Sequence, residues 1–267
     1  MADTPIRFDD GAGYERYMGQ WSQLAGEVFL DWLAPPSGLC WLDVGCGNGA
    51  FTHMLDERTA PAALQGIDPS AAQLAFAGLR ASLSGAGFCQ GDAMALPFPA
   101  ATFDAAVMPL VIFFLAEPAR GVAEMARVVC PGGMVSAYAW DMPGGGFPYH
   151  ALQSEIRALG YTLSKPPSPE ASRIEVLHAL WTAAGLLAVE TCAITVERSF
   201  ASFDDYWATV LLGPSVAPLL SAMAAEERAV LQARMRTRLP ADASGRILCS
   251  ARAHAVRGRV PAGRALP

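Results

Sequence analysis

Lysine, charge and long apolar runs are all scarce in this chain, and each scarcity excludes a class of protein. Only 16% of the 267 residues are charged, lysine occurs once, and the formal net charge is −6. A broad nucleic-acid surface needs clustered basic residues, so we expect no nucleic-acid partner. No run of about 18 uncharged apolar residues occurs, which argues against a membrane-spanning helix. With 52% hydrophobic residues, the chain has ample material for a buried core.

Signals for export, disulfides and metal binding are also missing. The first residues include Asp3, Asp9 and Asp10, where a secretory signal needs a basic and then an apolar region. The six cysteines are spread singly, so neither a zinc site nor a disulfide framework has its required spacing. Buried thiols in a reducing compartment are the simpler interpretation. We therefore expect a cytoplasmic protein without a metal site. Abundant alanine and glycine beside a single lysine point to a GC-rich bacterial genome.

Alternating strand and helix patterns fill the region from about residue 36 to 142. Strand-like runs lie at 39–44, 62–67, 86–90, 103–108 and 133–140, and helix-like runs lie between them at 48–57, 70–82 and 117–129. Short strands separated by helices predict parallel βαβ units in a doubly wound α/β sheet of the Rossmann-like kind. Such a sheet binds its ligand beyond the carboxyl ends of its strands.

The remaining residues are expected to complete the sheet and to cap it. Helical patterns occupy most of the first 35 residues and recur at 148–158, 171–184 and 202–237, while strand-like runs lie at 189–196 and 246–256. We expect a single domain over 1–267. Its core would span 36–142, 185–198 and 245–258, and its cap elements would span 1–35, 143–184 and 200–240.

One glycine-rich turn carries more information than any other stretch. It reads Leu-Asp-Val-Gly-Cys-Gly-Asn-Gly over 42–49, where an apolar strand opens into a helix. Glycine adopts backbone angles that other residues avoid, and it lets a ligand lie against the main chain. The following helix start also presents free amides. Two templates fit: Gly45-x-Gly47-x-x-Ala50 matches the dinucleotide fingerprint, and Asp43 with Gly45-x-Gly47-x-Gly49 matches the loop that binds S-adenosylmethionine.

Acidic residues also end the next two predicted strands. Asp68, in Gly-Ile-Asp-Pro-Ser, can accept hydrogen bonds from ribose hydroxyls, which suits either cofactor. Asp92, in Gln-Gly-Asp-Ala, can accept a hydrogen bond from the exocyclic amine of adenine. Alone, each acid also fits a helix cap or a turn. Together with Asp43, at successive strand ends, they favour a nucleotide-like ligand.

The full series of motifs resembles the class I S-adenosylmethionine-dependent methyltransferases. Beyond the glycine loop and the two acidic strand ends, it includes Leu-Pro-Phe at 96–98, Phe-Asp at 103–104 and Pro-Gly-Gly at 131–133. The resemblance is greatest to the small-molecule branch that contains the ubiquinone and menaquinone biosynthesis enzymes. It implies a seven-stranded, mostly parallel sheet with an antiparallel last strand. The implied cofactor is S-adenosyl-L-methionine, which leaves as S-adenosyl-L-homocysteine.

The resemblance also implies where the cofactor binds. Asp43 and the glycine loop would line its methionine part, Asp68 would hold the ribose hydroxyls, and Asp92 would meet the adenine. N-terminal aromatic residues would close over it, and residues just past the fourth strand would form the floor. The implied contacts are Tyr17, Trp21, Asp43, Gly45, Cys46, Gly47, Gly49, Asp68, Pro69, Ser70, Gly91, Asp92, Ala93, Met108 and Leu110.

Few residues are candidates for the chemistry, because the cofactor itself supplies the electrophile and a base is needed only for a weakly acidic acceptor. His150, just after three consecutive glycines, is the first candidate for a base, and Asp141 is the second. Many members of the family carry a histidine shortly after the fourth strand, where this chain has Phe113 and Phe114. This pair indicates either an apolar or aromatic acceptor or ordinary core packing.

The expected function is methyl transfer to oxygen, carbon or nitrogen of a small molecule, by a monomer or homodimer. Alternatives are methylation of RNA or protein, a non-catalytic S-adenosylmethionine-binding scaffold, and a nicotinamide-dependent oxidoreductase. Nine arginines against one acid follow residue 227. They form either solvated faces paired with acids elsewhere or a basic face for an anionic substrate or a partner subunit.

Overall fold

A mixed sheet organises the molecule. The computed structural model describes residues 15–80, 83, 85–214 and 216–263. Over these residues, seven strands pair in the order β3-β2-β1-β4-β5-β7-β6. Neighbouring strands from β3 to β5 are parallel, and β7 is antiparallel to both β5 and β6, which confirms the expected topology. The strands are β1 (Cys40–Val44), β2 (Ala63–Asp68), β3 (Gly87–Gln90), β4 (Phe103–Pro109), β5 (Val129–Trp140), β6 (Leu187–Phe200) and β7 (Ile247–Arg259).

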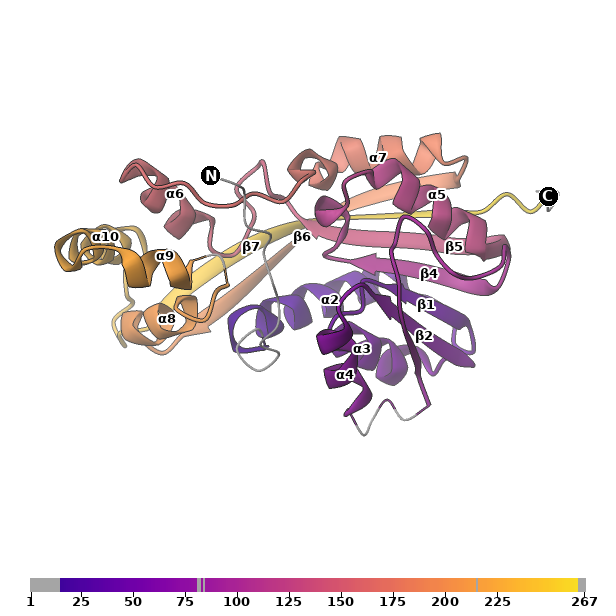
Figure 1. The fold of residues 1–267 in the computed structure, drawn as a ribbon, viewed down its shortest axis with the longest axis horizontal. Helices are drawn as coiled ribbons and strands as arrows, with labels where there is room; N and C mark the ends of the chain where they lie inside the picture. The colour runs from indigo at the N-terminus through magenta and orange to yellow at the C-terminus, as the bar shows by residue number, and fades with distance from the viewer. Residues whose placement is uncertain (1–14, 81–82, 84, 215, 264–267) are drawn as a thin grey trace.

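Helices cover both faces of the sheet (Figure 1). On one face lie α2 (Gln20–Leu33), α3 (Ala50–Thr59) and α4 (Ala71–Gly78), and on the other lie α5 (Pro118–Val128) and α7 (Ile174–Ala183). Apolar residues on the inner faces explain this packing. In α5, Val122, Met125 and Ala126 are buried, and in α7 the fully buried Trp181 donates a hydrogen bond from Nε1 to Val135 O at 2.9 Å.

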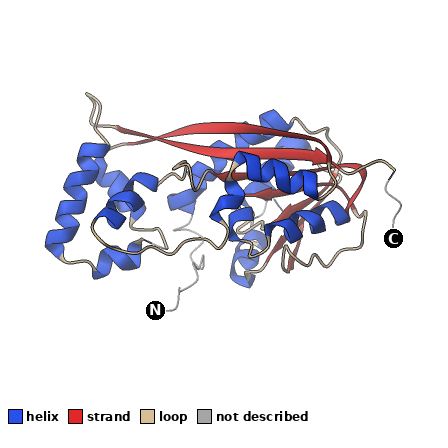
Figure 2. Ribbon diagram, turned by 90° about the horizontal axis from the view of Figure 1, so that it is seen from above, coloured by secondary structure: helices blue, strands red, loops and turns tan. Residues whose placement is uncertain are grey.

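The two last strands extend beyond the rest of the sheet. β5 ends at Trp140, opposite Ala253, whereas β7 continues to pair with β6 from Arg252 back to Ile247. The result is a long two-stranded ribbon, which is best seen from above in Figure 2. Side chains alternate along it, so that Ile194 and Val196 are buried and their neighbours are exposed. The ribbon carries the connection between β6 and β7 past the carboxyl end of β5.

Four helices gather at that end of the molecule (Figure 1). They are α6 (His150–Ala158), α8 (Phe203–Val210), α9 (Ala217–Ala222) and α10 (Ala225–Arg238). The sequence had predicted helical structure throughout 202–237, and this was wrong in one respect, because three separate helices occupy the span. Gly213 and Pro214 end the first, and Met223, with extended angles of φ −70° and ψ 140°, ends the second.

The N-terminal segment runs along the junction between these two groups of elements. A π-helical turn, η1 (Glu15–Gly19), leads into α2. The helix ends where Ala34 adopts a left-handed conformation (φ 43°), just before Pro35. Arg198 of β6 anchors the turn, since it donates to Tyr17 O and Arg16 O at 3.3 Å each. The expected helical start before residue 15 lies outside the described residues.

Other boundaries agree with the sequence-based expectations to within four residues, and β5 is one of the elements that differ by four. This strand begins at Val129 rather than at residue 133, because Val129 already pairs with Phe103. A register shift between Phe103 and Ala105 then accommodates the Pro-Gly-Gly turn. Two short 3₁₀ helices, η3 (Ile112–Phe114) and η4 (Pro169–Ser172), complete the fold. Within the described part of the chain, no helix has the length and apolar character needed to span a bilayer.

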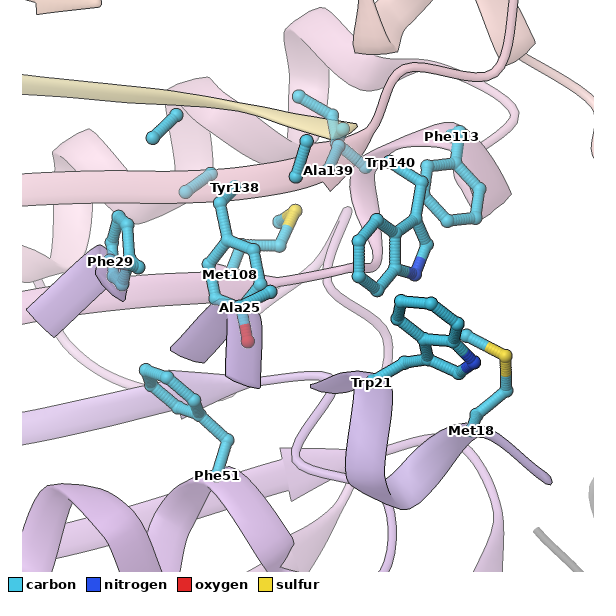
Figure 3. Packing of buried hydrophobic residues seen from close by; sticks show 14 of the residues in the cluster. Met18, Trp21, Ala25, Phe29, Phe51, Met108, Phe113, Tyr138, Ala139 and Trp140 are labelled. Carbon is cyan, nitrogen blue, oxygen red and sulfur yellow. The ribbon is translucent and has the colours of Figure 1, made fainter. Parts of the chain in front are cut away.

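An aromatic core joins the N-terminal helix to the centre of the sheet. Phe29 of α2 packs against Tyr138 of β5, with ring centroids 4.7 Å apart, and Phe51 of α3 lies 5.7 Å from the same tyrosine ring. Figure 3 shows Trp21 lying against Trp140, beyond this cluster toward the cap helices. Both tryptophans are at most 1% exposed. The core therefore holds α2 against one face of the sheet, with Trp21 at the start of the helix lying beside the carboxyl end of β5, where a ligand is expected.

Candidate functional site

The glycine loop forms the tight connection that its sequence predicts. It joins β1 to α3, and Gly45, Gly47 and Gly49 all have positive φ angles, of 76°, 53° and 77°. Such angles strain any residue with a side chain. The amides of Gly45 and Cys46 both donate to Ile67 O, at 2.7 and 3.1 Å. The loop is therefore tied to the end of β2, beside Asp68.

Asp68 and Gly47 form one wall of the site. The Asp68 carboxylate accepts hydrogen bonds from Gly47 N at 2.9 Å and Ser70 N at 2.8 Å, one on each oxygen. Each carboxylate oxygen can accept a second bond, so the group keeps capacity for two hydroxyls. A Cβ atom added at Gly47 would meet nothing within 4 Å. Open space therefore lies against the main chain beside a carboxylate, as a ribose-bearing ligand requires.

The end of β3 lies beside Asp68 on the same side of the site. Gly91 N donates to Asp68 O at 3.1 Å, and Gln90 Nε2 donates to Pro69 O at 2.9 Å, which holds the ends of β2 and β3 together. Asp92 is exposed, and its Oδ1 accepts a hydrogen bond from Met94 N at 2.8 Å within its own turn. Asp92 thus forms the turn that its sequence allowed, and its other carboxylate oxygen has no hydrogen bond within the described part of the chain and is free to meet the adenine.

Asp43 takes a different position from the one the resemblance implied. Its side chain is fully buried under the loop, where Oδ2 accepts a hydrogen bond from Thr52 Oγ1 at 2.7 Å. The other oxygen, Oδ1, has no partner among the described residues. Burial raises the pKa of Asp43 to about 7, against the opposing effect of the Thr52 bond and with help from the charge of Asp68. Asp43 is therefore a buried acid that supports the loop from beneath.

The segment after β4 completes the site from the other side. Leu110 has φ 61°, a strained conformation for leucine, and its amide donates to Tyr138 O at 2.7 Å. A Cβ at Gly45 would lie 2.4 Å from Val111 Cγ2, so the glycine loop and this segment are in direct contact. Met108 differs from the expectation, because it is fully buried in the core and Leu110 alone of the two reaches the site.

The N-terminal aromatic residues are packed against the cap helices. Tyr17 is 3% exposed and stacks on Tyr149, with centroids 4.4 Å apart and planes 9° apart. Tyr149 donates from its hydroxyl to Tyr17 O at 2.7 Å. Trp21 is fully buried against Trp140 (Figure 3). Tyr17 thus lies at the edge of the site, and Trp21 lies in the core behind it.

The same segment is linked to the glycine loop itself. Glu15 Oε2 accepts hydrogen bonds from Asn48 Nδ2 at 3.1 Å and from Arg80 Nη2 at 3.0 Å. Arg80 Nε also donates to Asn48 O at 2.7 Å. The sequence did not predict this triad, because Asn48 belongs to the glycine loop but Glu15 and Arg80 lie outside every motif. It holds the start of the N-terminal turn over the loop.

A cavity of about 390 Å³ lies between Leu110 and the cap helices. Its walls are mostly apolar and aromatic, and they include Phe113, Phe114 and Trp140. Both phenylalanine rings line this cavity, and Phe113 is also part of the buried core, so an apolar acceptor and core packing both remain as interpretations. The segment from Ser164 to Glu170 closes the far side, and sequence reasoning assigned it no role.

His150 lines the cavity, as the base candidate should. It begins α6, and its Nε2 lies 3.3 Å from Ser154 Oγ. Burial lowers the pKa of His150, and the nearby charges of Arg157 and Arg238 lower it further. The imidazole is therefore neutral at pH 7 and able to accept a proton.

Asp141 does not share this position. Its carboxylate is 4% exposed, accepts two hydrogen bonds from Arg252 at 3.0 and 2.5 Å, and accepts a third from Gly144 N at 2.9 Å. Burial would raise the pKa of Asp141, but these bonds outweigh it and the pKa lies below its usual value. An ion-paired carboxylate of this kind is a weak base, and Asp141 instead anchors the 141–146 loop to β7.

Comparison with known proteins agrees with the site. Residues 42–137 match the family described as "Methyltransferase domain". This match spans the glycine loop, Asp68, Asp92 and the segment after β4, which are the elements that form the wall of the site. Residues 42–137 therefore form a methyltransferase domain of the class I S-adenosylmethionine-dependent kind. The nicotinamide-dependent alternative is therefore wrong.

Several relatives are named for small molecules, and solved methyltransferases share the fold. The chain is 32% identical over 125 residues to "2-phytyl-1,4-naphtoquinone methyltransferase" of Thermosynechococcus vestitus, covering 46% of this chain and 54% of that one. It is also 32% identical to "Trans-aconitate 2-methyltransferase" of an Acidovorax strain, covering 68% and 64%. Phosphoethanolamine N-methyltransferase 2 of Haemonchus contortus, solved with S-adenosyl-L-methionine, superposes with a TM-score of 0.60 at 17% identity, covering 97% and 59%. The matches span only 44% to 54% of the first four relatives' own lengths.

The contact between the loop and Val111 predicts a steric effect that can be separated from backbone strain. Gly45→Ala should destabilise the protein by about 2–5 kcal/mol, because it adds a clash to the strain of a positive φ. Gly38→Ala is the matched control, since Gly38 has φ 77° with nothing within 4 Å of an added Cβ. It should cost only about 1–2 kcal/mol. Urea unfolding measures both. Equal losses in the two variants would contradict the contact.

The buried Asp43 predicts a pH dependence of stability. Because the pKa of Asp43 is raised to about 7 in the folded protein, its contribution to the free energy of unfolding is fully present below pH 4. This contribution is lost as the pH rises through 7. The free energy of unfolding of Asp43→Asn, relative to that of the wild type, should therefore rise by an amount on the order of 4 kcal/mol between pH 4 and pH 8. Urea unfolding of both proteins across this range measures the difference. A difference that does not change with pH would show that Asp43 titrates normally.

Proposed function

We propose that this chain transfers a methyl group from S-adenosylmethionine to oxygen, carbon or nitrogen of a small molecule held in the 390 Å³ cavity. The observation that carries the proposal is the position of Leu110 and Val111. Val111 touches the glycine loop at Gly45, and Leu110 lines the cavity. One short segment thus borders both the cofactor wall and the acceptor cavity, as direct transfer between them requires.

The residues present fit the cofactor. Asp68 retains two acceptor positions for hydroxyls, and Gly47 leaves open space beside it. Asp92 and Ala93 stand at the end of β3 for the adenine, and Tyr17 with the Glu15 turn lies over the loop. When bound, S-adenosylmethionine supplies an electrophilic methyl group on a positively charged sulfur. The protein then has to position the acceptor and exclude water.

His150 is the group best placed to take a proton from the acceptor. An acceptor hydroxyl loses its proton as its oxygen forms the new bond to carbon, and a neutral imidazole in the cavity wall can receive it. An acceptor that is already ionised needs no base. Asp141 has no such role in this proposal, because Arg252 occupies its carboxylate.

The shape of the cavity supports a small molecule over a macromolecule. The lining comes from the segment after β4, from α6 and from the 164–170 segment, so that the site is closed on several sides. A nucleic acid or a folded protein would need an open, extended groove. The relatives described by name act on a naphthoquinone, an aconitate and a fatty acid, which is consistent with a small acceptor.

Removal of the carboxylate that would accept hydrogen bonds from the ribose hydroxyls should weaken cofactor binding. Asp68→Ala is expected to weaken S-adenosylhomocysteine binding at least tenfold, because two charge-assisted hydrogen bonds are lost. Calorimetry measures the affinity, and circular dichroism confirms that the variant is folded. Glu57→Gln, which removes an exposed carboxylate of α3 outside the site, is the matched control and should bind as the wild type does. A wild-type protein that binds neither S-adenosylmethionine nor S-adenosylhomocysteine would refute the proposal.

The base assignment predicts a pH profile. Transfer of labelled methyl groups first identifies an acceptor that carries a proton on the reacting atom. With that acceptor, His150→Gln should lower kcat by about 10²–10⁴, while the affinity for S-adenosylhomocysteine stays unchanged. Because the pKa of His150 is lowered, the wild-type rate should fall only below pH 6.5, and this acidic limb should vanish in the variant. His178→Gln, on the exposed face of α7, is the control. An unchanged acidic limb in His150→Gln would exclude His150 as the base.

A further inference from the structure

Two cations without acidic partners stand at the same cavity. Arg157, in the last turn of α6, and Lys165, the single lysine of the chain, both line it and are both exposed. Among the residues that the structure describes, no acidic side chain lies within 4.0 Å of either charged group. Arg157 donates only to the neutral Gln153, at 3.3 Å. Glu170 also lines the cavity, but Arg173 holds its carboxylate in an ion pair.

The arginines of the C-terminal region provide a contrast. Arg234 and Arg238 both pair with Glu155, Arg236 pairs with Asp204, Arg252 with Asp141, and Arg257 with Glu190. Of the two interpretations of the arginine-rich region, pairing with acids elsewhere is therefore correct for these five. The excess positive charge that a ligand would meet is instead at the mouth of the cavity.

The buried end of the cavity contains a hydrogen-bond donor that has no partner among the described residues. Trp140 lines the cavity at 1% exposure, and its indole N–H has no hydrogen-bond partner within the described part of the chain. In Figure 3 this nitrogen lies on the side toward Met18, another lining residue, and away from Tyr138. A buried donor without a partner costs free energy comparable to a lost hydrogen bond. An oxygen atom of a bound molecule would satisfy it.

Between the two ends, the walls are apolar. Phe113, Phe114, Met142 and Phe147 line the cavity, so the middle of a ligand has to be apolar to be bound with a gain in free energy. Positive charge lies at the exposed end of the cavity and a single hydrogen-bond donor lies at the buried end. A ligand with an anionic group at one end and an oxygen at the other can therefore bind in only one orientation.

We propose that the acceptor is an amphipathic organic anion, with a carboxylate or phosphate head at Arg157 and Lys165, an apolar body along the phenylalanines, and an oxygen at Trp140. This inference rests on the proposed function and names its substrate class. It also assigns the reacting end: the head lies at the exposed mouth, whereas Leu110 and Trp140 lie at the buried end. The anionic head therefore serves for binding, and the atom that receives the methyl group is at the opposite end.

Three matched probes test the anionic head. Calorimetry with 4-phenylbutanoate, 4-phenylbutan-1-ol and 4-phenylbutylamine, with and without saturating S-adenosylhomocysteine, compares one skeleton with three charges. The carboxylate should bind at least tenfold more tightly than the alcohol, with an affinity that falls as salt is raised, and the amine should bind most weakly. 4-Phenylbutyl phosphate distinguishes the two kinds of head group. Whichever of the carboxylate and the phosphate binds more tightly is the head group that Arg157 and Lys165 fit.

Charge removal then locates the head. Arg157→Gln and Lys165→Gln should each weaken carboxylate binding about fivefold, and the double variant should do so by about 25-fold, with alcohol binding unchanged. Arg120→Gln, which removes an exposed arginine of α5 that lies outside the cavity, is the matched control. Equal binding of carboxylate and alcohol by the wild type, or losses in Arg120→Gln equal to those in the cavity variants, would overturn the proposal.

A double-mutant cycle tests the deep donor. 4-(4-Hydroxyphenyl)butanoate should bind about fivefold more tightly than 4-phenylbutanoate to the wild type and no more tightly to Trp140→Phe. The two proposals fail separately. If S-adenosylhomocysteine binds but the probes show no preference for the anion, the substrate class is wrong and methyl transfer stands. If the anion is preferred but S-adenosylhomocysteine does not bind, the anion site stands and methyl transfer is wrong.

Discussion

The site depends on the close approach of the glycine loop to the segment that follows β4. Gly45 has no side chain, and the space that a Cβ would need is taken by Val111 at 2.4 Å. The preceding residue, Leu110, has a left-handed conformation at the edge of the cavity, and its amide is bonded to Tyr138 O. Backbone strain of this kind is often found at functional sites. A cofactor wall and an acceptor cavity can share a border only if this contact exists.

The long β6–β7 ribbon provides the second constraint. The last six residues of β6 pair with a part of β7 that extends beyond β5, so the helices between these strands are carried past the end of β5 and placed beside the strand ends. The ribbon also fixes the N-terminal turn through Arg198 and the 141–146 loop through Arg252. Several of the buried charged groups of this protein thus act as anchors. This explains why Asp141, a good candidate by position, is unsuited to proton transfer.

Most of the sheet was predictable from the sequence, because its strands are short apolar runs between clear turn signals. The wall of the site was predictable for the same reason, since the loop glycines and Asp68 occur at fixed distances from strand ends. The burial of Asp43 and Met108 was not predictable, because sequence position does not show which side of a strand end a side chain occupies. Glu15 and Arg80, which contact Asn48 of the loop, and the Arg157–Lys165 pair lie outside any motif. Only the packing of distant segments brings these residues together.

The most direct test of the account is a crystal structure with bound S-adenosylhomocysteine. The account predicts that its ribose hydroxyls bond to Asp68 and that its sulfur lies beside Leu110, facing the cavity lined by Phe113, Trp140 and His150. In that case a methyl group on the sulfur would point at the acceptor. A sulfur atom that faces away from this cavity, or is separated from it by protein atoms, would contradict the central claim.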